Sequence, residues 1–158
     1  MLWSGLLQLI TTKNIAMKII QANQSYRSAI IELLKTEKLP VDDLPGNLDH
    51  FFVAIIHDVV VGAIGLEHYP PLGLLRSMVV HKDYRNQKIA AALVQTLEKY
   101  ANGLKVHSIY LLTETASTWF DTKNYQRVER TEVPDAIKQS TEFSSVCPVS
   151  AIVMKKSL

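Results

Sequence analysis

The sequence predicts a layered α/β domain, and three observations lead to this prediction. Short runs rich in Val, Ile and Phe recur along the chain, which is typical of strands. Segments whose apolar residues keep helical spacing fall between some of these runs. Two turn sequences, "HDVVVG" at 57–62 and "YPPLG" at 69–73, join the strand-like runs between 51 and 80 and predict an antiparallel meander.

Local patterns along the chain predict seven strands and three helices. The candidate strands lie at 17–21, 51–56, 59–67, 74–80, 106–113, 125–131 and 149–155. A first helix is predicted over 25–38, where apolar residues recur at helical spacing and Pro40 follows to stop the helix. A second helix begins at Ile89 and ends near Gly103, which we place as its C-cap. A third, short helix is predicted over 116–123.

The chain length predicts a single domain with a real core, since 158 residues are too few for two comfortable cores. We assign the domain to residues 17–158, because the stretch that Met17 opens looks like a domain start. Residues 1–16 are either an appended segment or a short extra helix packed on the domain. No signal peptide is predicted, because no Lys or Arg precedes the short apolar run at the beginning of the chain.

The charge and the cysteine count exclude several function classes. A net charge of +2 without a run of basic residues argues against nucleic acid or a membrane as partner. Cys147 is the only cysteine, so an internal disulfide and a zinc site of paired cysteines are excluded, and a reducing cytoplasm fits best. The histidines show no ligand spacing, which predicts turn or surface positions and no metal site; they are His50, His57, His68, His81 and His107.

The stretch "LLRSMVVHKDYRNQKIAAAL" at 74–93 is predicted to form a strand, a short loop and a helix. A helix N-terminus binds anions through its unpaired N–H groups and its partial positive charge. Lys82, Arg85 and Lys88 crowd this helix start, where Asp83 is the only acid. An anionic ligand would explain these cations; the alternative is that they are solvated loop residues.

The same stretch resembles motif A of the GNAT acetyltransferase superfamily, with an aromatic residue before Arg85 and Ala90 in the final small-residue position. "LLTETASTWFDTKNYQRV" at 111–128 resembles GNAT motif B, in which Asn124 stands for the family glycine. The tail, together with "GLEHY", "LLRSMVV" and "LLTETA", resembles a small GNAT branch of arsenic-resistance N-acetyltransferases. The resemblance covers roughly residues 17 to 158.

This resemblance implies a GNAT fold, a mixed and mostly antiparallel sheet flanked by helices. It implies an enzyme that transfers acetyl from acetyl-CoA to the amine of a small, amino-acid-like substrate, and it allows a homodimer. The alternatives are a non-catalytic module that binds acyl-CoA, and a structural protein without the ligand. The residues implied to bind coenzyme A are Met78, Val79, Val80, Arg85, Asn86, Gln87, Lys88, Ile89, Ala90, Thr115 and Phe120.

Two of these residues depart from the family pattern. Lys88 replaces a glycine, and lysine adopts the left-handed conformation only at a cost. If position 88 is instead already helical, its amide still faces the ligand; we therefore expect phosphate binding to persist. Phe120 stands where many relatives have a tyrosine that protonates the leaving thiolate, so that proton must come from another group or from solvent.

Glu67 is the first candidate for the general base. Strand alternation places it on one face with Val61, Ala63 and Gly65, whose small side chains would leave room for a substrate. The alternative is a strand-end acid exposed before Pro70.

Glu114 is the second candidate, unless it only caps the third helix. Arg76, Ser77 and Thr113 are candidate substrate-binding residues; Arg76 either holds a substrate carboxylate or faces outward at an edge. Since one cysteine cannot chelate arsenic, a role in arsenic resistance would be acetylation of an amine, and Cys147 is interpreted as a buried apolar residue.

Overall fold

The computed structural model describes residues 17–146 and 149–158, in which one mixed sheet carries the fold. The expectations for residues 1–16 and for Cys147 lie outside these described residues. The strands run in the order β1-β2-β3-β4-β5-β7-β6, and every neighbouring pair is antiparallel except β4 and β5. Their bounds are β1 Met17–Gln21, β2 Phe51–Ile56, β3 Val59–Tyr69, β4 Leu72–Val80, β5 Ser108–Thr113, β6 Gln126–Val128 and β7 Ile152–Ser157. The predicted fold class is confirmed.

The predicted meander is β2-β3-β4. His57 and Asp58 form the tight turn between β2 and β3, and both have positive φ, 50° and 64°. That conformation at both central residues is the type I′ turn, whose twist matches the twist of the flanking strands. The second turn is tighter than expected, because β3 extends to Tyr69 and β4 begins at Leu72.

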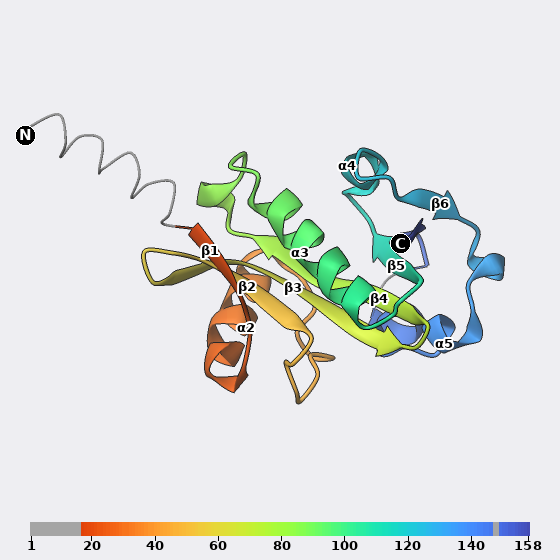
Figure 1. Cartoon of the computed structure of the whole chain (residues 1–158), viewed down its shortest axis with the longest axis horizontal. Helices are drawn as coiled ribbons and strands as arrows, with labels where there is room; N and C mark the ends of the chain where they lie inside the picture. Colours follow the sequence, from red (N-terminus) through yellow and green to blue (C-terminus); the bar gives the residue numbers. More distant parts are fainter. Residues whose placement is uncertain (1–16, 147–148) are drawn as a thin grey trace, which may run out of the picture.

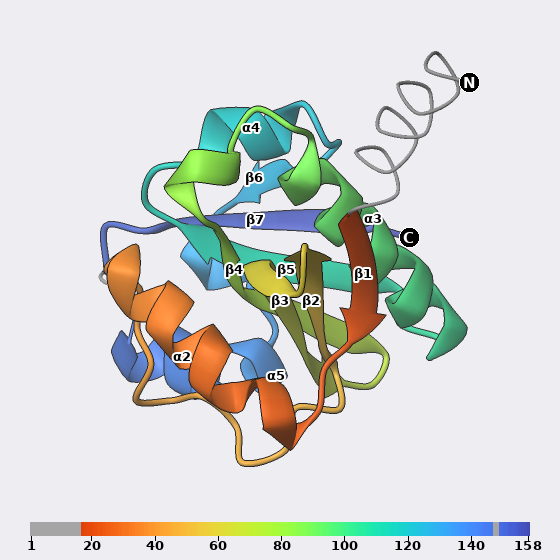
Figure 2. The ribbon, with the colours of Figure 1, turned by 90° about the vertical axis from the view of Figure 1, so that its left-hand side faces the viewer.

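Helices cover the two faces of the sheet (Figures 1 and 2). The helix α3 (Ile89–Gly103) packs its apolar side on one face, where its buried residues join those of β2, β3 and β5 in one cluster. On the opposite face, α2 (Arg27–Thr36) buries Ile30, Leu33 and Leu34 against β2 and β3. The short α5 (Asp135–Lys138) buries Ile137 against Leu74 and Tyr110 on the β5 side of the same sheet.

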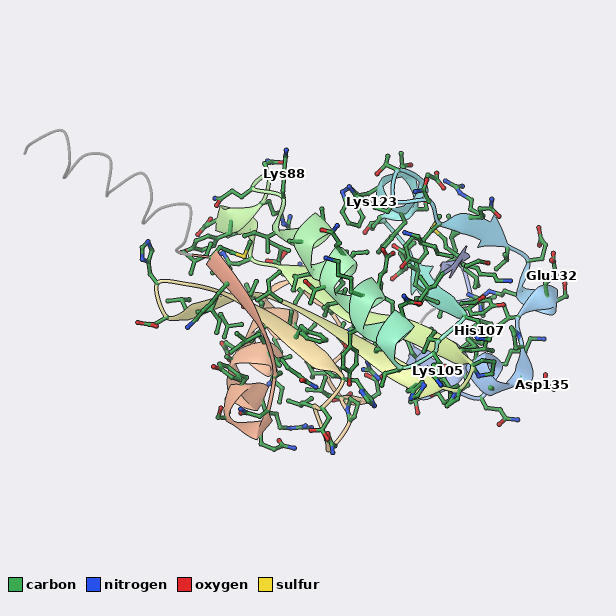
Figure 3. All side chains as sticks on the ribbon, viewed as in Figure 1. Lys88, Lys105, His107, Lys123, Glu132 and Asp135 are labelled. Carbon is green, nitrogen blue, oxygen red and sulfur yellow. The ribbon has the colours of Figure 1, made fainter. Side chains whose placement is uncertain are left out.

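The helix ends differ from the prediction in detail. α2 begins at Arg27 rather than Ser25, because a 3₁₀ turn (Gln24–Tyr26) precedes it. α3 begins at Ile89 and ends at Gly103, as predicted, but its C-cap is Leu104 rather than Gly103. Lys105, labelled in Figure 3, follows the cap. Its backbone is left-handed, with φ of 63°, and the amide of Val106 donates to the carbonyl of Ala101 at 3.0 Å. This is the Schellman pattern.

The C-terminal region holds the largest differences. The expected strand 125–131 is the short β6, and the expected strand 149–155 is β7, which lies between β5 and β6. The structure adds a 3₁₀ turn (Arg130–Glu132), α5 and a π-helical turn (Glu142–Val146) that the sequence did not predict. Elements of three to five residues are too short for a helical period to appear in the sequence. No helix among the described residues has the length and apolar character that crossing a membrane requires.

Candidate functional site

The central feature of the candidate site is the divergence of β4 and β5. These parallel strands pair only from Leu72–Ser108 to Leu74–Tyr110. Beyond that point β4 runs toward the N-terminus of α3, while β5 runs toward α4 (Ser117–Asp121; Figure 1). Within the described residues, the backbone of β4 from residue 75 to residue 80 therefore has no strand partner on the β5 side. Such an unpaired strand edge can bind an extended ligand through backbone hydrogen bonds.

A bulge distorts β4 within this unpaired stretch. Ser77 has φ of 54°, and the pairing with β3 shifts between Ala63–Val79 and Gly65–Arg76. Two residues of β4, Ser77 and Met78, therefore face one residue of β3. Bulges re-aim side chains and are common beside active sites. Of the predicted ligand-binding residues, Met78 is part of this bulge, and Val79 and Val80 follow it immediately.

The turn from β4 into α3 brings the predicted phosphate-binding residues together. Lys88 is the N-cap of α3 with φ of 63° and ψ of 20°, so the interpretation that position 88 is already helical is wrong. Asn86 is also left-handed, with φ of 65°. The residues of this turn, Arg85, Asn86, Gln87 and Lys88, are exposed, and the side chain of Lys88 points away from the body of the molecule (Figure 3).

The first turn of α3 offers an anion its free N–H groups. No side chain caps the helix at Lys88, and no acid lies in its first turn. Ile89 is buried and anchors the helix on the core, while Ala90 is half-buried. Arg85 is not free: its guanidinium forms an ion pair with Glu37 at the end of α2. An anion at this turn would compete with Glu37 for Arg85.

Glu67 lies in β3 opposite Leu74, the last β4 residue that pairs with β5. Both of its carboxylate oxygens are held: the Tyr69 hydroxyl donates to Oε1, and Arg76 Nη1 donates to Oε2 at 2.8 Å. The side chain of Glu67 is 18% exposed. Burial, then the hydrogen bond and charge of Glu67, raise the pKa of Tyr69, so its hydroxyl stays protonated and donates.

Arg76 is buried, which excludes one of its two interpretations, the outward-facing edge position. Its Nη2 is 3.0 Å from Oδ1 of Asp43, its Nη1 also donates to the Asp43 carbonyl, and its Nε donates to Ser77 Oγ. Burial lowers the pKa of Arg76, but the carboxylates of Glu142, Asp43 and Glu67 outweigh it and raise the pKa. The outward-facing alternative is therefore wrong. For the other alternative, a substrate carboxylate, no guanidinium nitrogen is left free, because all three already have partners within the protein.

The predicted face of β3 requires a correction. The register with β2 shifts between Ala54–Gly62 and Ile55–Val60, so Val61 turns to the α3 side of the sheet, whereas Ala63 faces the α2 side. A Cβ at Gly65 would lie 2.5 Å from the ring of Phe51. The space that Gly65 leaves is therefore filled by Phe51 rather than kept for a substrate.

The turn after β5 holds the remaining predicted residues. The Oγ1 of Thr113 accepts a hydrogen bond from the Ala116 amide at 2.9 Å, so Thr113 rather than Glu114 supports the start of α4. Glu114 and Thr115 are exposed. Phe120 is 3% exposed and packs edge-to-face on Trp119 and Tyr125, so its ring belongs to the core.

Asn124 follows α4 with φ of 70°, as its interpretation as a glycine substitute predicts. It leads directly into Tyr125, whose amide donates to the Phe120 carbonyl at 3.1 Å. His50 lies in a turn, as predicted, whereas His68 departs from the prediction because it lies within β3. The Nδ1 of His50 lies 2.6 Å from the Tyr100 hydroxyl, and the His50 and His68 rings are 5.8 Å apart. The described part of the chain holds no group of three or more side chains suited to a metal ion.

Sequence reasoning missed two residues of this site, Tyr69 and Asp43. Asp43 lies in the loop between α2 and β2, 33 residues before Arg76, and its side chain is 3% exposed. The available signal was Arg76 itself, because a cation within an apolar strand needs a buried acid as partner. The sequence does not show which acid that is.

Comparison with known proteins agrees with this arrangement. A sequence model of the Acetyltransferase (GNAT) family matches residues 19–119. An amino-acid acetyltransferase from Buchnera aphidicola subsp. Schizaphis graminum is 27% identical over 139 residues, which are 81% of this chain and 31% of that protein. An uncharacterized N-acetyltransferase from Chlorobaculum tepidum is 27% identical over 123 residues, covering 77% of this chain and 79% of that protein. This chain spans less than a third of the length of the amino-acid acetyltransferases that it matches.

Solved structures show the same fold. An acetyltransferase of the GNAT family from Staphylococcus aureus superposes with a TM-score of 0.73 at 27% identity, covering 90% of this chain and 99% of that chain. N-acetylglutamate synthase from Neisseria gonorrhoeae, complexed with coenzyme A and N-acetyl-glutamate, has a TM-score of 0.78 at 14% identity, covering 90% of this chain and 35% of that chain. Since the family model spans well over half of the sequence, this chain belongs to the Acetyltransferase (GNAT) family.

Proposed function

We propose that this protein transfers the acetyl group of acetyl-CoA to the amine of a small, amino-acid-like substrate. The observation that carries the proposal is the divergence of β4 and β5, with Glu67 beside its apex. The named amino-acid acetyltransferase relatives support the reaction type and the acceptor class. The N-acetylglutamate synthase structure that contains coenzyme A supports the choice of acyl donor.

The residues present fit coenzyme A. The pyrophosphate would bind the uncapped first turn of α3, where Lys88 adds a cation and Arg85 a second one once Glu37 releases it. The extended pantetheine arm would run beside the backbone of Met78, Val79 and Val80, which has no strand partner on that side within the described residues. When bound, acetyl-CoA supplies the thioester carbonyl that the amine attacks.

Glu67 is the proposed general base. It takes one proton from the acceptor ammonium, directly or through a water, and the neutral amine then has a lone pair for attack. The new C–N bond forms as the C–S bond breaks, and the electron pair of that bond leaves on sulfur. The amine nitrogen loses its second proton to solvent. The thiolate takes its proton from solvent, since Phe120 has no proton to give and its ring is buried.

The narrower parts of the proposal concern acceptor, location and assembly. The tail and the stretches "GLEHY" and "LLRSMVV" resemble the arsenic-resistance branch, so we include arsenic-containing amino acids among the proposed acceptors. The proposed location is the cytoplasm, and the proposed assembly includes a homodimer. Size-exclusion chromatography with light scattering tests the homodimer.

The deciding experiment is a panel of amines incubated with acetyl-CoA, with release of the thiol and mass spectrometry of the acetylated product as readouts. The panel should contain acidic, basic and neutral amino acids, arsenic-containing amino acids and simple amines. We expect product with at least one amino acid. Thiol release with no acetylated product from any amine would contradict the proposal.

Two departures from the family pattern favour a second candidate function, an acyl-CoA-binding module without turnover. Lys88 stands at the family glycine, and Phe120, where many relatives have a tyrosine, is buried and has no proton to give the leaving thiolate. Isothermal titration with acetyl-CoA separates the candidates in combination with the panel. Binding together with turnover supports the acetyltransferase, whereas binding with no turnover supports the module.

A further inference from the structure

Glu67 is the partly exposed end of a chain of buried charges that begins in the loop between α2 and β2. The chain runs from Asp43 to Arg76 at 3.0 Å, and from Arg76 to Glu67 at 2.8 Å. The side chains of Asp43 and Arg76 are each 3% exposed, while that of Glu67 is 18% exposed. Only the last member of the chain is accessible to a substrate or a water.

We infer that Asp43 and Arg76 are positioning residues, which hold the carboxylate of Glu67 in the orientation that accepts the acceptor's proton. This inference rests on the proposed function and adds two residues to it. Arg76 fixes Oε2 and Tyr69 fixes Oε1, so rotation of the Glu67 carboxylate would break two hydrogen bonds at once. Asp43 fixes Arg76 in turn, through its carboxylate and its backbone carbonyl.

The energetics of the chain favour a functional reason for it. A buried ion pair loses so much solvation that a well-packed apolar replacement is often as stable. Here the pair is also incompletely satisfied, because neither carboxylate oxygen of Asp43 has a hydrogen-bond partner among the described groups, although Oδ1 is ion-paired with Arg76. Stability alone therefore does not account for a buried charge network at this place, and the network ends at the proposed base.

The charges around Glu67 predict opposite effects for the two positioning residues. The groups that face this carboxylate or its guanidinium partner are Arg76 from β4, Tyr69 from β3, Asp43 from the α2–β2 loop and Glu142 from the π-helical turn. Removing the charge of Asp43 leaves Arg76 with fewer competing carboxylates, which favours ionised Glu67. Removing the charge of Arg76 takes away the cation beside Glu67 and therefore disfavours the ionised form of Glu67.

The first test compares Asp43→Asn with Asp42→Asn, an exposed neighbour in the same loop. We expect Asp43→Asn to lower kcat by about 10- to 100-fold. This is the loss found when a residue that orients a metal ligand is replaced, and Asp43 likewise acts through another side chain. The KM for acetyl-CoA should not change, and the acidic limb of the pH–rate profile should move to lower pH. Asp42→Asn should match the parent in all three measurements. Parent-like kcat and pH profile in a folded Asp43→Asn would overturn the inference.

The second test is Arg76→Gln, whose acidic limb should move to higher pH. The double variant should lose less activity than the two single losses multiplied, because both residues act through Glu67. A purely structural role predicts no opposite shifts of the two limbs. Limbs that move in the same direction would therefore overturn the inference.

Two further measurements keep the inference testable if Asp43→Asn does not fold or no acceptor is found. Tyr69→Phe removes a donor to Glu67 without exposing a buried charge, and we expect a lower kcat and an acidic limb at higher pH. NMR titration of the ¹³C-labelled Glu67 carboxyl needs no turnover; its midpoint should fall in Asp43→Asn and rise in Arg76→Gln and Tyr69→Phe. Parent-like behaviour of Tyr69→Phe in both measurements overturns the inference. An inactive parent with the expected NMR shifts contradicts only the proposed function.

Discussion

Lys88 and Asn124 share the left-handed backbone conformation, with φ of 63° and 70°, although one precedes α3 and the other follows α4. Both stand where the resemblance to GNAT motifs places a glycine. A side chain in this conformation costs roughly 1–2 kcal/mol, less for asparagine than for lysine. The chain therefore keeps the backbone path of both motifs without the residue that normally makes that path easy.

Replacement of Lys88 by glycine should stabilise the protein. Glycine adopts this conformation without strain, and we expect the free energy of unfolding to rise by about 0.5–1 kcal/mol, measured by urea denaturation. Lys88→Ala is the matched control, since it removes the same ammonium group but keeps a Cβ in the strained position. Equal stability of the Gly and Ala variants would contradict a strained backbone at position 88.

The same two variants separate backbone from charge in coenzyme A binding. Isothermal titration should show Lys88→Gly binding coenzyme A as tightly as the parent or more tightly, because the turn gains the freedom that glycine gives. Lys88→Ala loses the cation without this gain and should bind more weakly. Tighter binding by Ala than by Gly would show that the left-handed turn does not contribute to the site.

Asn124 gives a second test of a glycine position. Asn124→Gly should be neutral or slightly stabilising, whereas Asn124→Val should lower the melting temperature clearly, because a β-branched side chain is strained at positive φ. Thermal unfolding followed by circular dichroism measures both. The prediction fails if the two variants melt at the same temperature.

The sequence predicted those parts of the fold that local signals determine. The meander was predictable because His57 and Asp58 mark a tight turn between apolar runs, and α3 because its apolar spacing persists over four turns. The bulge that moves Val61 to the other face was not predictable, since strand alternation assumes an unbroken ladder. The pairing of Arg76 with Asp43 depends on a loop that folds back over the sheet, and nothing local in the sequence records that contact.

The ion pair between Arg85 and Glu37 leads to a prediction of how charge at the phosphate turn affects coenzyme A binding. Arg85→Glu should weaken the affinity for coenzyme A sharply at low salt, because it places a carboxylate beside the proposed pyrophosphate site. Glu37→Gln should strengthen it, because it frees Arg85 from its present partner. Lys99→Glu, an exposed charge reversal toward the far end of α3, is the control and should change little. Parent-like affinity in Arg85→Glu would place the phosphate turn elsewhere.

The raised pKa of Tyr125 predicts that the protein loses stability at alkaline pH. Burial, then the charge and hydrogen bond of Glu98, raise the pKa of Tyr125 above its ordinary value of 10.0. In the unfolded chain this tyrosine loses its proton near pH 10, while the folded protein keeps it. The folded state then binds more protons, so the free energy of unfolding falls as the pH rises above about 10.

Tyr125→Phe should make this decline shallower, and urea denaturation at several pH values between 8 and about 11 measures it. The hydroxyl of Tyr125 donates to Glu98 at 2.9 Å, so the variant should also be somewhat less stable at neutral pH. Tyr84→Phe, in the loop before α3, is the control variant. An equally steep decline in Tyr125→Phe and the parent would contradict the prediction.

Glu67→Gln should leave the fold and the affinity for acetyl-CoA intact, while turnover at pH 7 falls by roughly the 10²–10⁴-fold that a lost general base costs. The loss should shrink at high pH, because the acceptor amine is then already deprotonated and no base is needed.

Glu114→Gln is the matched control: Glu114 is exposed and Thr113 makes the contact that supports α4, so this variant should keep both activity and stability. The comparison uses the acceptor found in the amine panel. An inactive Glu114→Gln beside an active Glu67→Gln would show that the base lies on β5 rather than β3. If both variants stay active, the proton leaves to solvent, and the site accelerates transfer only by holding the two substrates together.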